Sequence, residues 1–242
     1  MQTKARFASR PLNGQSASLP PHDHPAIVGG RTIYPSTVVS PRDHWALKSG
    51  ANWRKIGGEV LKGKWRGFPL YILNLEERQT CPTACRHWRS CYANHMQWMQ
   101  RMEAGPDLEW KLEREVALLA IDHPNFCVRL HGAGDFYSCE YVVLWRRLLE
   151  RHEGLRVFGY TARTDDAIAD ALRALARDAG WSRFAMRVSN GPFPLRSTIT
   201  IESVRQKPAD SIVCPEQIGR TESCSTCAVC WATEKRVAFL QH

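Results

Sequence analysis

The 242-residue chain has no apolar run that approaches the roughly 18 to 20 residues of a membrane-spanning helix. Its first residues, MQTKARFASRPLNGQ, contain no apolar block of the kind that secretory signal peptides carry. We therefore expect a soluble, unexported protein that works in the cytoplasm and has no membrane partner.

The sequence also lacks the common local motifs of nucleotide-binding and hydrolytic enzymes. It contains no Walker phosphate loop, no nucleophile elbow, no HExxH motif and no paired-carboxylate pattern. Acidic residues are scarce as well, because 24 Asp and Glu stand against 33 Lys and Arg, for a net charge of +9. A basic balance favours polyanionic partners, either nucleic acid or a charged small molecule.

From residue 68 onward, apolar strand patterns alternate with helical ones. The predicted strands cover residues 68–75, 127–130, 156–160, 184–188, 197–203 and 211–215. Helical periodicity covers 98–121, broken at Gly105-Pro106, then a stretch from Tyr141 to His152, and another from an N-cap at Thr164 to Gly180. This order predicts an α/β fold: a parallel β/α sheet or a partial (β/α) barrel, in which ligands bind beyond the carboxyl ends of the strands.

Three regions follow from composition. Residues 1–45 carry six of the 14 prolines and little periodicity, so we expect an irregular or disordered arm whose removal up to residue 40 leaves folding unchanged. Residues 46–210 are predicted to form the β/α core, and residues 211–242 a cysteine-rich, metal-binding cap.

Seven of the nine cysteines fall into two groups, which points to thiolate ligands rather than scattered core residues. The first group has the spacing C-x3-C-x5-C in a loop after a strand, and consists of Cys81, Cys85 and Cys91. Three thiolates can hold three irons of a [4Fe-4S] cluster and leave the fourth iron open to a ligand. The alternative is a zinc site completed by His87 or His95.

The second group has the spacing C-x9-C-x2-C-x2-C and consists of Cys214, Cys224, Cys227 and Cys230. Four thiolates fit a fully ligated [4Fe-4S] cluster or a structural zinc ion. Some of these cysteines could instead complete the first site across space. Cys127 on a strand and Cys139 at a helix start are interpreted as packing residues.

Several strings of this sequence resemble the phage gene product 88 family over about residues 50–242. They are KIGGEVLKGKWRG, LEERQTCPTACRHWRSCY, HGAGDFYS, FGYTAR and CSTCAVCW. More distantly, a cysteine loop after the first strand and a Gly-rich acidic turn after the second resemble the radical S-adenosylmethionine superfamily. The spacing departs from that superfamily, where the last two cysteines are usually separated by two residues and follow an aromatic residue.

The superfamily resemblance implies that the first cluster binds the methionine part of S-adenosylmethionine, with a turn formed by Gly132, Gly134 and Asp135 holding its amino group. Reductive cleavage would then modify a substrate, for which the net charge favours nucleic acid or a nucleotide, with electrons from a separate donor. The resemblance to a phage family implies the cytoplasm of a bacterial host. Arg187 and Ser189, at the end of a predicted strand, could reach a ligand carboxylate or ribose, although a structural salt bridge explains Arg187 as well.

A rival hypothesis is a non-catalytic, zinc-bound protein that binds nucleic acid. It rests on the basic stretch from 53 to 66, where Trp53 and Trp65 alternate with lysines and an arginine in a pattern suited to phosphate contact and base stacking.

Overall fold

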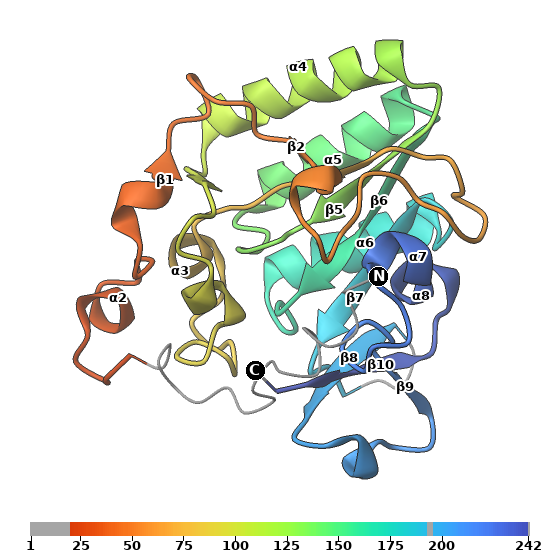
Figure 1. Cartoon of the computed structure of the whole chain (residues 1–242). Helices are drawn as coiled ribbons and strands as arrows, with labels where there is room; N and C mark the ends of the chain where they lie inside the picture. Colours follow the sequence, from red (N-terminus) through yellow and green to blue (C-terminus); the bar gives the residue numbers. More distant parts are fainter. Residues whose placement is uncertain (1–19, 193–195, 242) are drawn as a thin grey trace.

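A computed structural model of the chain describes residues 20–192 and 196–241 (Figure 1). Its main sheet has eight strands, which are β2 (Lys48–Ser49), β3 (Leu70–Ile72), β5 (Phe126–Leu130), β6 (Leu155–Thr161), β7 (Phe184–Ser189), β8 (Ser197–Ile201), β9 (Ser211–Val213) and β10 (Arg236–Leu240). They lie in the order β2-β3-β5-β6-β7-β8-β10-β9. All neighbours are parallel except β2 and β3, which confirms the expected α/β fold with a mostly parallel sheet.

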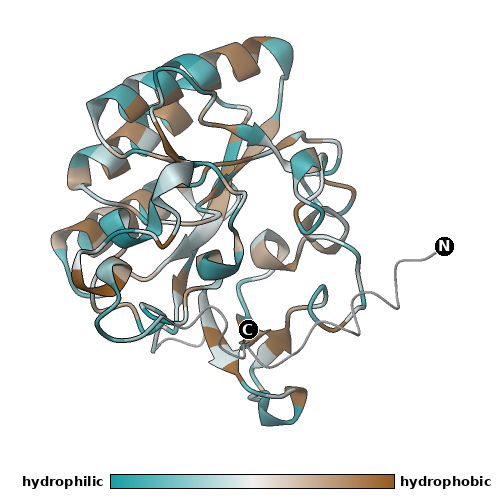
Figure 2. Cartoon of the chain, turned by 60° about the vertical axis from the view of Figure 1, so that its left-hand side comes forward, coloured by the Kyte–Doolittle hydropathy of each residue, from teal (hydrophilic) through white to brown (hydrophobic). Residues whose placement is uncertain are grey.

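Three amphipathic helices cover one face of this sheet (Figure 1). They are α4 (Pro106–Asp122), α5 (Cys139–Arg151) and α6 (Ala167–Ala179). Their apolar sides pack against the strand side chains that point to this face. Figure 2 shows hydrophobic (brown) strands beside helices that also carry hydrophilic (teal) residues. Burying one large apolar side chain contributes about 1.5–3 kcal/mol, and the largest of those buried in this cluster are Phe126, Phe136, Tyr141, Trp145 and Phe184.

The opposite face of the sheet is covered by the C-terminal segment and by the chain from residue 53 to 68. Two short helices of that segment, α7 (Cys224–Cys227) and α8 (Val229–Ala232), contain three of the cysteines. Trp65 stacks on Trp231 with ring centroids 5.5 Å apart, and both lie against Phe158 of β6. The cap is therefore fixed to the sheet by an aromatic cluster.

The remaining elements are short. They are α2 (Pro25–Val28), η1 (Pro35–Thr37), β1 (Val38–Val39), η2 (Gly50–Asn52), α3 (Glu77–Thr80), η3 (Tyr92–His95), β4 (Arg101–Met102) and η4 (Val204–Gln206). Strands β1 and β4 pair in parallel as a second, two-stranded sheet. In the part of the chain that the structure describes, no helix is long and apolar enough to cross a membrane.

Three sequence expectations about elements differ from the structure. The helix predicted from 98 begins only at Pro106, because Arg101 and Met102 are buried in β4 and Gly105 turns the chain with φ 136°. The N-cap of α6 is Asp166 rather than Thr164, since its carboxylate accepts a hydrogen bond from the Ala169 amide at 2.8 Å. Strand β10 was not predicted, and it inserts between β8 and β9.

Candidate metal centre

The first cysteine loop, residues 81–91, begins at the carboxyl end of the β3–α3 segment. His87 of this loop lies beside strands β7 and β8. Its Nε2 is 3.0 Å from Nδ2 of Asn190, which follows β7, and 3.1 Å from Oγ1 of Thr200 in β8. The loop thus extends along the carboxyl edge from β3 to β8. This edge is where the parallel fold predicts a ligand site.

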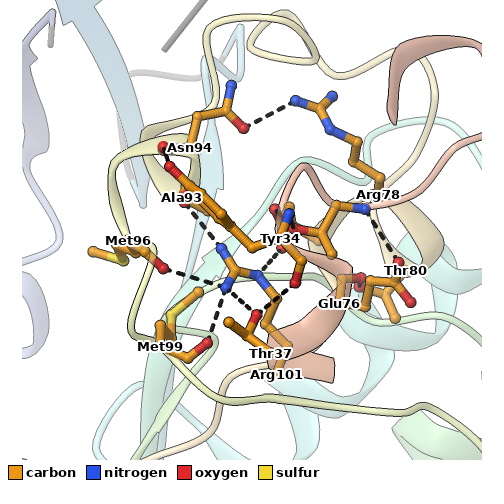
Figure 3. A network of polar contacts seen from close by, with 12 residues as sticks. Tyr34, Thr37, Glu76, Arg78, Thr80, Ala93, Asn94, Met96, Met99 and Arg101 are labelled. Carbon is orange, nitrogen blue, oxygen red and sulfur yellow. Dashed lines mark hydrogen bonds and ion pairs between the residues drawn. The ribbon is translucent and has the colours of Figure 1, made fainter. Parts of the chain in front are cut away.

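Two buried arginines hold the backbone of this loop and of the residues after it (Figure 3). Arg78, on α3, donates hydrogen bonds to the Trp88 carbonyl oxygen and, at 3.0 Å, to Asn94 Oδ1. Arg101, on β4, donates to the carbonyl oxygens of Ala93 at 3.0 Å and Met99 at 2.9 Å. The cysteine positions are therefore set by protein contacts around them.

Glu77 joins this network to the N-terminal segment. Its Oε2 accepts a hydrogen bond from Arg101 Nε at 2.8 Å, and its Oε1 accepts one from Thr32 Oγ1 at 2.9 Å. The Thr32 amide donates to Glu76 Oε1 at 3.1 Å, and Tyr34 donates to the Asn94 carbonyl oxygen. Residues 32–34 are thus joined to the core by hydrogen bonds, whereas residues 1–19 lie outside the described residues and the arm over residues 1–45 stays a prediction as a whole.

The three thiols of the first loop are close enough to affect one another's ionisation. Burial raises the pKa of Cys81 well above its ordinary value, and Asp135, Cys91 and Cys85 raise it further. Burial likewise raises the pKa of Cys91 to about 12, and Glu77 adds to that rise. Three thiolates would repel one another here unless a cation joined them, as a metal ligand set requires.

The turn after β5 packs tightly against the extension of β3. A Cβ built on Gly132 would lie 1.9 Å from Asn74 Oδ1, and one on Gly134 would lie 2.6 Å from Leu75 Cβ. Gly134 also has a φ of 87°, which glycine adopts readily. These glycines are therefore required by the close approach of two chain segments.

The Asp135 carboxylate in the same turn is engaged by the protein. Its Oδ1 accepts hydrogen bonds from the Phe136 amide and Thr161 Oγ1, both at 2.8 Å, and its Oδ2 accepts one from the Ala162 amide at 2.7 Å. Burial raises its pKa to about 6 against these hydrogen bonds. The carboxylate joins the ends of β5 and β6, and its contact with a cofactor stays a prediction.

The second cysteine group lies on the face of the sheet that carries Phe158. Cys224 and Cys230 pack against the apolar cluster to which Phe158 belongs. The Cys224 amide donates to the Lys55 carbonyl oxygen at 2.7 Å and the Ser225 amide to that of Ile56 at 3.0 Å, so residues 55–56 clamp α7. Lys55 Nζ pairs with the buried Glu216 at 2.9 Å, between Cys214 and α7. The group is thus held by backbone and ionic contacts.

Arg187, predicted as a ligand contact, supports this cap instead. It is fully buried, with Nε donating to the Cys230 carbonyl oxygen at 2.9 Å and Nη1 to that of Lys235 at 2.8 Å. It also donates to the Thr233 carbonyl oxygen and stacks on Trp181. Its partners are carbonyl oxygens rather than the expected salt-bridge carboxylate. Ser189 is half-buried and pairs in register with Thr198 of β8.

The thiols of the second group also share one electrostatic neighbourhood. Burial raises the pKa of Cys214 to about 12 and that of Cys224 to about 11. Cys230 raises both further, while Lys55 opposes the rise. Burial raises the pKa of Cys227 as well, and Cys230 adds to it while Lys62 opposes it. Cys230 thus affects the ionisation of the other three thiols of the second group, and their role as one ligand set stays a prediction.

In the described ranges, no three His, Cys, Asp or Glu side chains already converge as a metal site. Cys127 is fully buried in the apolar cluster beneath the cap, and Cys139 is the first residue of α5. The burial of Cys127 agrees with the packing role predicted for it, whereas Cys139 is half-buried and its packing role stays a prediction.

Sequence reasoning missed the residues that surround the thiols. Arg129 and Tyr160 come from adjacent strands and face the second group, with the Tyr160 hydroxyl 2.8 Å from Cys230 Sγ. Alternate residues of a strand point to the same face of the sheet. Because Arg129 is two residues from Cys127 and Tyr160 is two residues from Phe158, the sequence could have placed both on the face that carries the second cysteine group.

A protein-family model described as Gene product 88 matches residues 45–191, which is more than half of the chain. The match contains the first cysteine loop and the Gly132–Asp135 turn, and it ends before the second cysteine group. No curated protein and no solved structure matches the chain.

Proposed function

Because the chain belongs to the phage Gene product 88 family, whose name states no activity, we propose its function from the site: an iron–sulfur protein that acts in the manner of radical S-adenosylmethionine enzymes. Its substrate is not identified by these residues. The net charge of +9 favours nucleic acid or a nucleotide, and an electron donor is required. We place this activity in the cytoplasm of a bacterial host.

The observation that carries the proposal is the position of Cys81, Cys85 and Cys91. They lie in one loop at the carboxyl edge of a parallel sheet, beside the turn that contains Asp135. Three thiols with no fourth cysteine in the loop suit a cluster that keeps one iron open. Parallel β/α folds place their reaction centres at this edge.

The residues fit an iron–sulfur cluster by donor chemistry. All three thiols are half-buried, so iron would be bound by soft ligands in surroundings with little water. Burial and mutual repulsion raise the pKa of Cys81 and Cys91, and a bound cation relieves both penalties. When bound, the cluster together with S-adenosylmethionine would supply one-electron reductive cleavage of the sulfonium.

The protein groups around this loop have separate tasks in the proposal. Arg78 holds the Trp88 carbonyl oxygen within the loop, and Arg101 holds the carbonyl oxygens of Ala93 and Met99 in the segment directly after it. Buried Asp135 joins the ends of β5 and β6 next to Cys81, which shapes the wall of the site. The second cysteine group, over the other part of the same sheet, would hold an auxiliary [4Fe-4S] cluster or zinc.

The rival function as a nucleic-acid-binding zinc protein gains no support from the stretch 53–66. Trp65 is buried against Trp231, and its Nε1 donates to the Ser182 carbonyl oxygen at 3.2 Å. Its ring is therefore not available to stack on a base. Zinc remains an outcome that the test below distinguishes.

The proposal is tested on full-length protein purified without oxygen. Iron, sulfide and zinc are measured per chain, and the paramagnetic resonance spectrum of the reduced protein is recorded with and without S-adenosylmethionine. We expect iron and sulfide, a spectrum that shifts with S-adenosylmethionine, and 5′-deoxyadenosine formed under dithionite. The Cys81→Ala variant should lose the shifting signal, and Cys139→Ser, the matched control, should keep it. Zinc without iron, or a reduced cluster that ignores S-adenosylmethionine, would contradict the proposal.

A further inference from the structure

Arg129 is a half-buried cation on β5. In the part of the chain that the structure describes, it forms no ion pair with Asp or Glu, and its Nε is buried without a hydrogen-bond acceptor. A desolvated cation is costly unless a negative group stands near it. Its position therefore calls for an anionic neighbour.

The nearest candidate anions are the thiols of the second cysteine group. Arg129 Nη1 lies 4.0 Å from Cys224 Sγ. The guanidinium is thus positioned to face thiolates.

Tyr160 continues this arrangement on the neighbouring strand. Strands β5 and β6 pair with Arg129 opposite Phe158, so Tyr160 lies two residues further along the same face. Its hydroxyl donates to Cys230 Sγ at 2.8 Å, and the Arg129 guanidinium lies 5.6 Å from its ring centroid. One donor therefore faces each of two sulfurs, and the two donors support each other by a cation–π contact.

We propose that Arg129 and Tyr160 are positioning residues for a negatively charged four-cysteine metal centre formed by Cys214, Cys224, Cys227 and Cys230. Four thiolates around a dipositive zinc ion or a dipositive cluster leave two negative charges. The Arg129 cation offsets part of that charge, and the Tyr160 hydroxyl donates to one ligand sulfur. The inference rests on the part of the proposed function that places a metal at this group, and it applies to either metal.

Removing the Arg129 charge should lower the reduction potential of an iron centre here, because the reduced, more negative state loses its counter-charge.

The experiment compares metal release to a chelator from full-length protein purified without oxygen. Arg129→Met should release the metal of the second group about 10–100-fold faster, as expected when an outer partner of a metal ligand is lost. Tyr160→Phe should release it about fivefold faster, the factor of one neutral hydrogen bond. Arg129→Lys, which keeps the charge, should fall between the wild type and Arg129→Met.

The matched control is Arg156→Met. Arg156 lies on the same sheet face, paired with Cys127, and its guanidinium donates to the carbonyl oxygens of Glu153 and Leu155. It should release metal at the wild-type rate. If Arg129→Met fails to fold, Arg129→Lys and Tyr160→Phe give the same comparison.

The outcomes separate this inference from the proposed function. Release at the wild-type rate from both Arg129→Met and Tyr160→Phe, with unchanged thermal unfolding, would overturn the inference even if the protein contains iron and responds to S-adenosylmethionine. Zinc at the second group of a chain that contains no iron, released faster from Arg129→Met, would support the inference while the iron–sulfur function fails. A wild-type chain that binds no metal would overturn both.

Discussion

The substitution Arg101→Met tests whether the cysteine loop is held by the protein itself. Arg101 and Glu77 are 0% and 2% exposed and pair at 2.8 Å. Arg101 also donates to Thr37 Oγ1 at 2.8 Å and to carbonyl oxygens of the segment after the loop, namely those of Ala93, Met96 and Met99. Methionine keeps most of the side-chain length and removes every one of these donors.

The expected loss follows from the carboxylate that remains. Without Arg101, the buried Glu77 would keep only the Thr32 hydroxyl among the partners that the network shows. Removing one member of a buried ion pair costs about 3–5 kcal/mol, because the other charge stays desolvated. We therefore expect the free energy of unfolding to fall by about that amount.

The matched control is Arg42→Met, which breaks the ion pair of Arg42 with Asp107 on α4. That pair has the same short separation, 2.7 Å, but its side chains are 71% and 51% exposed. Exposed pairs contribute only about 0–1 kcal/mol, so this variant should unfold close to the wild type. The difference in stability between the two variants therefore measures the effect of burying an ion pair, because both variants remove an ion pair of similar length.

The assay is urea unfolding followed by circular dichroism, together with alkylation of metal-free protein. In Arg101→Met, Cys91 should react faster with iodoacetamide, because the carbonyl oxygens of Ala93, Met96 and Met99 in the segment that follows it have lost their donor. The Arg42→Met variant should react at the wild-type rate. Equal stability and equal alkylation in the two variants would refute the reasoning that this buried network fixes the loop.

Three further predictions follow from other contacts. Burial raises the Asp135 pKa from 3.8 to about 6, so the contribution of Asp135 to stability is present below about pH 4 and is lost as the pH rises through 6. The free energy of unfolding of the wild type relative to Asp135→Asn should therefore fall by about 3 kcal/mol between these two pH values. Urea titration of both proteins at each pH measures this difference. Deletion of residues 1–40 should lower the melting temperature, because it removes the hydrogen bonds of Thr32 to buried Glu76 and Glu77. The sequence alone led us to expect no change, and an unchanged melting temperature would support that expectation. Cys127→Ala should keep the metal content of the wild type at some cost in stability, because its side chain packs in an apolar cluster, and metal analysis that shows a loss would make Cys127 a ligand.

Local patterns determined much of the fold. The apolar runs at 127–130, 156–160 and 184–188 each became a strand, because short continuous apolar segments between polar turns have few other ways to be buried. The helix that Gly180 was expected to stop does end there, at a glycine with φ 72°. The grouping of the thiols into two ligand sets, which spacing also suggested, stays a prediction, because no three His, Cys, Asp or Glu side chains of the described residues converge as a metal site.

Long-range contacts decided the rest. Thr32 and Thr37 form hydrogen bonds with Glu76, Glu77 and Arg101, which lie far away in the sequence. The prolines and polar residues around Thr32 therefore gave no indication that its side chain is buried. Strand β10 is a five-residue segment whose place between β8 and β9 is set by pairing partners rather than by its own pattern.

The same division applies to the site. The sequence by itself determined which residues can ligate a metal, because thiols at close spacing are a local property of the chain. Only the tertiary structure decided what surrounds them: Arg187 turned from a predicted ligand contact into a support of the cap, and Arg129 and Tyr160 came to face the sulfurs. The physical reason is that a buried charge or hydroxyl takes its role from the partners that folding brings within hydrogen-bond distance, and a linear sequence does not contain those distances.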